Sequence, residues 1–146
     1  MLKQILGGIV GYIATFICMF IAFTCFYLGM GADRAFQPGS YEVSMLWIVL
    51  SLIVIFICGS IGGYVASLIG GSGAAKILAG IILVLQLIVL AIIYTSGIPN
   101  EARTADVPNM VAMSKAQTPL WAVLIQTVCS ISGALVGGGL RKNKLT

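Results

Sequence analysis

The sequence predicts an all-α integral membrane protein in which four transmembrane helices form one bundle. Of its 146 residues, 60% are hydrophobic and 8% are charged, whereas soluble domains carry about 25% charged residues. The hydrophobic residues also gather in four runs, each near the roughly 20 residues that a helix needs to cross a bilayer. We therefore expect one membrane domain over residues 1–146, in contact with the lipid bilayer.

The first predicted helix covers about residues 6–30 and carries its small residues on one stripe. Bulky aromatic side chains lie opposite this stripe. The apolar core is too long for a signal peptide and no clear cleavage site follows it, so we expect it to remain as a membrane anchor. The stripe consists of Gly7, Gly11, Ala14, Cys18, Ala22 and Cys25.

The second predicted helix covers about residues 45–69 and ends in a glycine-rich stretch, residues 58–71. At about 100° per residue, this stretch divides into a small side and a large side. A helix with one small face inside a bilayer is suited to close contact with another helix. The residues predicted to pack in this way are Gly59, Gly62, Gly63 and Ala66.

The third and fourth predicted helices cover about residues 77–96 and 120–140. The fourth again has a small face, which includes Gly133 and Gly137. Close helix packing is the ordinary use of such a face, and a narrow conduit lined by small residues is the alternative. Two buried amides, Gln86 and Gln126, are predicted to bond each other or the backbone as a clasp between helices. Contact with a bound or permeating molecule is the alternative.

The charges predict an orientation in the membrane. One side carries basic residues and no acid, whereas the other carries all four acids, so both termini are expected in the cytoplasm. Trp47 and Trp121 stand where the chain re-enters the membrane, as interfacial anchors do. The segment 98–118 is either a short amphipathic surface helix or a solvated connector. The first side holds Lys3, Lys76, Arg141, Lys142 and Lys144; the second holds Asp33, Arg34, Glu42, Glu101, Arg103, Asp106 and Lys115.

The chain contains an apparent internal repeat at an offset of roughly 70 residues. Residues 46–50 resemble 120–124, and Cys58 with Gly62 resembles Cys129 with Gly133. Two repeated hairpins would be related by an axis along the membrane normal. The alternative is that apolar, glycine-rich helices resemble one another through composition.

The residue types argue against catalysis and cofactor binding. No Asp, Glu, Lys, Arg or His lies in any predicted span, although proton-coupled transporters and voltage sensors place ionisable groups there. Cys18, Cys58 and Cys129 share a depth at which a soft metal is chemically possible. Cysteine in apolar surroundings more often acts as a small hydrophobe, and Met110 and Met113 indicate copper only weakly. We expect no enzyme activity, no metal and no cofactor.

The stretch Ser60-Ile61-Gly62-Gly63-Tyr64-Val65-Ala66, followed by a glycine-rich turn and Ala79-Gly80-Ile81-Ile82, resembles small Gly-rich four-helix bacterial inner-membrane proteins of unknown function. This resemblance implies a four-span fold in the bacterial inner membrane. It implies no activity, substrate or catalytic residue.

The function expected from the sequence is that of a non-catalytic membrane protein that acts through helix–helix packing. It would be a homo-oligomer or a small subunit of a membrane complex, so its partner would be itself or another membrane protein. The alternative is a channel or carrier for a neutral or hydrophobic solute. Nucleic acid is not expected as a partner, because the basic residues stand at helix ends and form no polar face.

Overall fold

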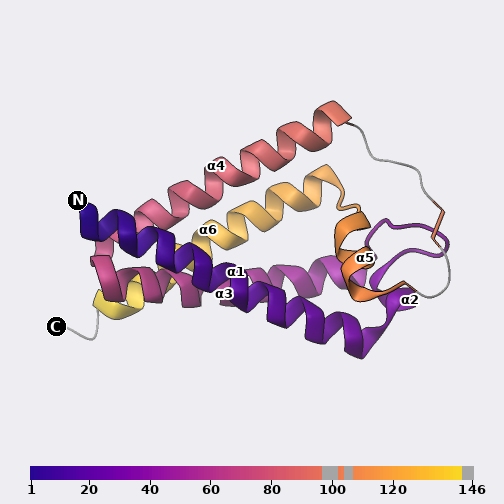
Figure 1. Cartoon of the computed structure of the whole chain (residues 1–146), viewed down its shortest axis with the longest axis horizontal. Helices are drawn as coiled ribbons and strands as arrows, with labels where there is room; N and C mark the ends of the chain where they lie inside the picture. Colours follow the sequence, from indigo (N-terminus) through magenta and orange to yellow (C-terminus); the bar gives the residue numbers. More distant parts are fainter. Residues whose placement is uncertain (97–101, 104–106, 143–146) are drawn as a thin grey trace.

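The computed structural model describes residues 1–96, 102, 103 and 107–142, and these residues form an all-α bundle (Figure 1). Four of its helices are long and apolar enough to cross a membrane, which confirms the prediction of an all-α bundle with four long apolar helices. The N-terminus and the end of the last helix lie at one end of the bundle, here called the terminus end, and the shorter helices lie at the other, the loop end. The helices are α1 (Leu2–Met30), α2 (Ala32–Ala35), α3 (Met45–Gly70), α4 (Ser72–Ser96), α5 (Asn109–Lys115) and α6 (Leu120–Lys142).

The turn between α3 and α4 is shorter than the sequence predicts. The predicted helices, 45–69 and 77–96, leave residues 70–76 between them, but Gly71 alone separates α3 from α4. Gly71 has φ 75° and its N–H bonds the carbonyl oxygen of Ser67, which ends α3. Because a residue without a Cβ adopts this conformation at little cost, α4 begins at once, several residues earlier than predicted.

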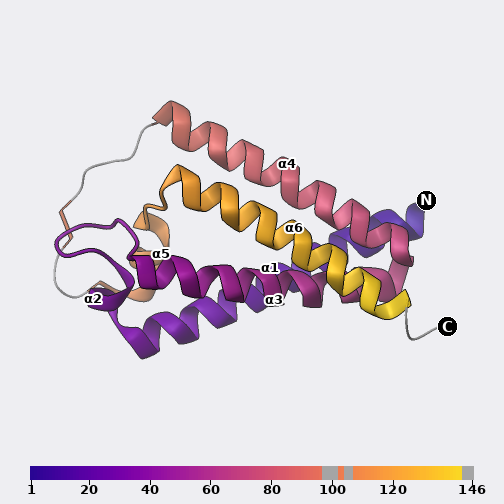
Figure 2. The same ribbon diagram turned by 180° about the vertical axis from the view of Figure 1, so that it is seen from behind.

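Helix α3 is the centre of the bundle, and its most extensive contacts are with α6 and α1. Helix α4 packs across α1 and α6 near the terminus end. Toward the loop end, α4 and α1 diverge, which is visible from both sides in Figures 1 and 2. As a result, α4 has the smallest buried share of the four long helices.

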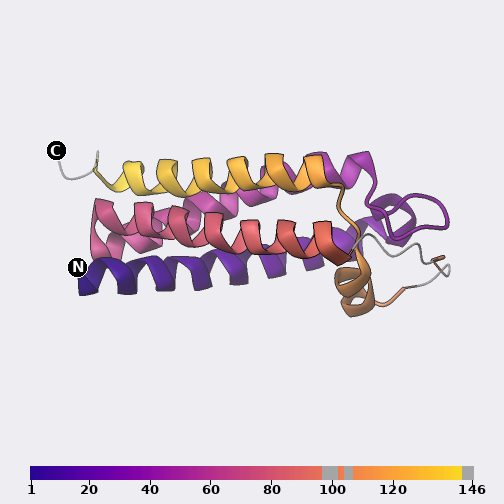
Figure 3. The same ribbon diagram turned by 90° about the horizontal axis from the view of Figure 1, so that it is seen from above.

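A small apolar cap closes the loop end (Figure 3). The chain after α2 folds back through an antiparallel bridge between Phe36 and Val43. Ser44 then caps α3, because its hydroxyl accepts a hydrogen bond from the N–H of Trp47 at 3.1 Å. The buried residues of this cap are Tyr27, Ala35, Phe36, Tyr41, Val43, Ile48, Val107, Ala112 and Ala122.

Candidate functional site

The small residues of α3 lie on two faces, and the first of these packs against α1. A Cβ added at Gly11 would lie 2.7 Å from the Cβ of Ala66 and 2.7 Å from the carbonyl oxygen of Gly62. A Cβ at Gly7 would lie 2.7 Å from the carbonyl oxygen of Ala66. Since real Cβ atoms do not approach other atoms so closely, this helix contact depends on glycine.

The second small face of α3 packs against α6. Gly63 lies against the backbone of Ala134, and a Cβ added at Gly59 would lie 2.8 Å from the carbonyl oxygen of Ser130. From the other side, Gly133 meets the carbonyl of Phe56, and Gly137 meets the backbone of Ser60 in the same way. The predicted packing residues therefore lie in contacts within one chain, and neighbouring backbone fills the space that a conduit along these stripes would need.

The two glutamines have different surroundings. The side chain of Gln126 donates a hydrogen bond to the hydroxyl of Ser51 at 2.9 Å, which joins α6 to α3. This partner differs from those we expected, which were Gln86 or the backbone. Within the described part of the chain, the partly buried amide of Gln86 makes no hydrogen bond.

Gln86 lines a crevice of about 140 Å³ between α1, α4 and α6. Ser130 of α6 is also part of its lining. The hydroxyl of Thr15 donates to the carbonyl oxygen of Gly11 at 2.9 Å, so its lone pairs can still accept a hydrogen bond. Apolar side chains such as Met19 and Val89 form most of the remaining wall. The crevice can therefore hold a neutral, largely apolar molecule with one hydrogen-bonding group.

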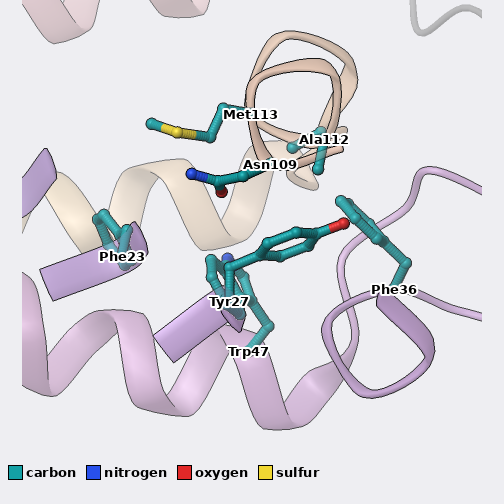
Figure 4. A pocket seen from close by; sticks show the side chains of 8 residues that line it. Phe23, Tyr27, Phe36, Trp47, Asn109, Ala112 and Met113 are labelled. Atoms are coloured by element: carbon teal, nitrogen blue, oxygen red, sulfur yellow. The ribbon is translucent and has the colours of Figure 1, made fainter. Parts of the chain in front are cut away.

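A second, smaller cavity of about 30 Å³ lies in the cap at the loop end (Figure 4). Trp47 forms part of its wall, with its ring centroid 5.7 Å from that of Phe23 and 6.4 Å from that of Tyr27. Trp121, the other expected anchor, is 46% exposed and lies outside this cavity. The phenol of Tyr27 donates to the carbonyl oxygen of Val107 at 2.7 Å, which holds the cap on α1.

The cysteines do not form the three-membered set that a metal site would need. The sulfur atoms of Cys18 and Cys58 are 3.1 Å apart, between α1 and α3. In the described ranges, no group of three or more His, Cys, Asp or Glu residues is placed to hold a metal ion. On α5, Met110 is 68% exposed and Met113 is 42% exposed.

The charged residues at the loop end pair across the cap. The guanidinium of Arg103 bonds the carboxylate of Asp33 at 2.9 Å and also lies over the ring of Phe36, 5.8 Å from its centroid. Within the predicted surface segment 98–118, residues Asn109–Lys115 form helix α5. Glu101, Asp106 and Lys144 lie outside the described residues.

Comparisons with models of protein families, with curated proteins and with solved structures find no match for this chain.

The sequence identified Gln86 as a buried polar residue but did not identify the residues that surround it. Thr15 and Ser130 could have been found as hydroxyls within apolar helices. Asn109, which lines the smaller cavity at the loop end, had no such signal, because it follows Pro108 in the connection between the predicted helices.

Proposed function

We propose that this protein is a non-catalytic, multi-pass membrane protein that binds a neutral hydrophobic molecule in the crevice between α1, α4 and α6. The observation that carries this proposal is the unpaired amide of Gln86 in the crevice wall. Leaving an amide without a partner in an apolar environment costs about 2–7 kcal/mol, depending on the reference state. A ligand with a carbonyl or hydroxyl group would satisfy that amide.

The shape and lining of the crevice favour binding over transport of ions. Ligand sites between helices of a bundle are mostly apolar, with a few polar groups that set the orientation of the ligand. Gln86, Thr15 and Ser130 supply such groups from three different helices. None of the described residues that line the crevice is Asp, Glu, Lys, Arg or His, so this lining offers no charge to a driving ion.

The test uses a long-chain ketone that carries a photoreactive diazirine, and the hydrocarbon of the same length as its matched probe. In membranes, the ketone should label peptides that contain Met19 or Val89. Gln86→Leu should reduce this labelling by about fivefold, because one hydrogen bond contributes about 1 kcal/mol. Gln37→Leu, at an exposed glutamine of the loop end, is the control. Equal labelling by the ketone and the hydrocarbon would contradict the proposal, because it would show that the carbonyl group adds nothing to binding.

A second candidate is action through helix–helix contact, as a homo-oligomer or as a small subunit of a membrane complex. The observation in its favour is the exposed apolar surface of α4, where Val84 is 57%, Leu87 is 55% and Ile88 is 50% exposed. Cross-linking in native membranes, followed by light scattering and mass spectrometry in mild detergent, tests it. A homo-oligomer or a stoichiometric partner supports this candidate, and a monomer without companions contradicts it.

We also propose that the termini are cytoplasmic, that the membrane is a bacterial inner membrane, and that the chain is a repeat of two hairpins. The one-sided placement of Lys3, Lys76 and Arg141 supports the orientation. The central pairing of α3 with α6 is the arrangement that two repeated hairpins would give. Reporter fusions at residues 1 and 146 test the orientation, and activity on the opposite side would contradict it.

A further inference from the structure

The cavity at the loop end is a second place where a ligand can bind, and it shares no lining residue with the crevice. Helix α5 covers it from one side, while α1 and the start of α3 form the other side (Figure 4). Two aromatic side chains of the wall, Phe23 and Tyr27, each pack against the ring of Trp47. Most of the wall is therefore apolar and is fixed by ring packing.

Two polar groups in this wall lack partners. The carboxamide oxygen of Asn109 is buried and accepts no hydrogen bond, although the amide nitrogen of the same side chain donates to the hydroxyl of Thr24 at 3.3 Å. The indole N–H of Trp47 makes no hydrogen bond to any residue that the structure describes. Figure 4 shows the Asn109 carboxamide over the side of the cavity where the rings of Trp47 and Tyr27 lie. One acceptor and one donor are thus present in the same apolar wall.

The charges around the cavity favour a neutral ligand. Among the residues that the structure describes, no acidic side chain lines it, and the guanidinium of Arg103 already lies over the ring of Phe36. A cationic ligand would meet this like charge, whereas an anionic one would have to compete with Asp33, which pairs with Arg103 at 2.9 Å. A neutral hydroxyl group can both donate to a carbonyl oxygen and accept from an N–H.

We propose that this cavity binds the hydroxyl group of an aliphatic alcohol, between the carboxamide oxygen of Asn109 and the indole N–H of Trp47. The hydroxyl donates to Asn109 and accepts from Trp47, and the first carbons of the alcohol lie against Phe23 and Met113. The alcohol is either a membrane lipid or a small water-soluble molecule, because both offer the same group. A cavity of about 30 Å³ also has room for water, which is the result that would overturn the proposal.

The experiment measures the fluorescence of Trp47 in vesicles, in a Trp121→Phe background that leaves one tryptophan. Bromine quenches an indole on contact, so 2-bromo-1-undecanol, whose bromine is on the carbon next to the hydroxyl-bearing carbon, and 2-bromoundecane form a matched pair with and without the hydroxyl. We expect half-quenching of Trp47 at a concentration of the alcohol at least about fivefold lower than that of the bromoalkane, as one or two hydrogen bonds allow. Bromopropanol added from water is the third probe. Stronger quenching by it assigns the ligand to the water-soluble class, and stronger quenching by bromoundecanol assigns it to membrane lipids.

Two variants connect the effect to the cavity. Asn109→Ala should remove the difference between alcohol and alkane, whereas Ser114→Ala, on the exposed side of the same helix, should leave it. Met113→Phe places a larger side chain in the cavity and should weaken quenching by the alcohol even if Asn109→Ala does not fold. Equal quenching by alcohol and alkane in the parent protein would overturn the proposal, because it would show no preference for the hydroxyl. A difference that survives both Met113→Phe and Asn109→Ala would also overturn it, because the preference would then arise outside this cavity.

Discussion

The side-chain amide of Gln126 donates a hydrogen bond of 2.9 Å to the hydroxyl oxygen of Ser51, and this bond joins α6 to α3 within the apolar part of the bundle. Ser51 is buried, and its own hydroxyl donates to the carbonyl oxygen of Ile48 at 2.7 Å. Ser51 therefore uses its donor within its own helix and its acceptor between helices. Bonds of this kind between transmembrane helices contribute about 0.6 kcal/mol on average, with a maximum near 1.7 kcal/mol.

Gln126→Leu should therefore lower the free energy of unfolding by about 1 kcal/mol. Ser51→Ala should have a similar effect, and the double variant should lose little more than either single one, because both remove the same bond. Unfolding in mixed micelles measures these differences. Thr127→Val is the control, since the hydroxyl of Thr127 bonds Val123 of its own helix. Fully additive losses would contradict the bond.

Gly63→Ala should prevent normal folding of the bundle. A methyl group at this position would collide with the backbone of Ala134, which cannot move aside as a flexible side chain can. Gly80→Ala is the matched control, since nothing lies within 4 Å of a Cβ at that mid-helix glycine. Thermal stability in detergent should fall sharply for the first variant and stay level or rise for the second. Equal stability of the two would contradict the packing of α3 on α6.

Mild oxidation should join Cys18 to Cys58 within one chain. Their sulfur atoms are 3.1 Å apart, which is about 1 Å more than the bond length of a disulfide. After treatment with copper phenanthroline and denaturation, a maleimide reagent should label only Cys25 and Cys129 of the four cysteines, because the disulfide protects the other two. With Cys58→Ser, Cys18 should stay free and intramolecular protection should be lost. Labelling of all four cysteines after oxidation would contradict the placement of α1 on α3.

Tyr27→Phe should loosen the cap at the loop end. The phenol bonds the buried carbonyl oxygen of Val107 at 2.7 Å, and an unsatisfied buried acceptor costs about 1–3 kcal/mol. Hydrogen exchange of α5 should accelerate in this variant by at least about fivefold. Tyr94→Phe serves as the control, because Tyr94 is 82% exposed. Unchanged exchange of α5 would show that other contacts hold the cap.

The sequence predicted the four long helices because bilayer thickness sets their length and composition. It also identified the glycines of the packing faces, since small residues at helical spacing mark such contacts. It could not predict that Gly59 and Gly63 meet α6 while Gly62 and Ala66 meet α1, because the partner of each face depends on the arrangement of the whole bundle. The crevice at Gln86 was unpredictable for the same reason: it results from the angle between α4 and α1.

The two glycine faces of α3 also determine which part of the bundle can change shape. Rotation of α3 about its axis, or a shift along it, would drive backbone into backbone on both sides, so α1, α3 and α6 behave as one rigid slab. The start of helix α4 is interlocked in the same way, because a Cβ added at Gly8 would lie 2.8 Å from the side chain of Ile77 and one added at Gly70 would lie 2.8 Å from the Cβ of Ala74. Further along α4, no described atom lies within 4 Å of a Cβ at Gly80. Any widening or narrowing of the crevice would therefore take place in the part of α4 beyond Gly80, while the start of the helix stays fixed against the slab.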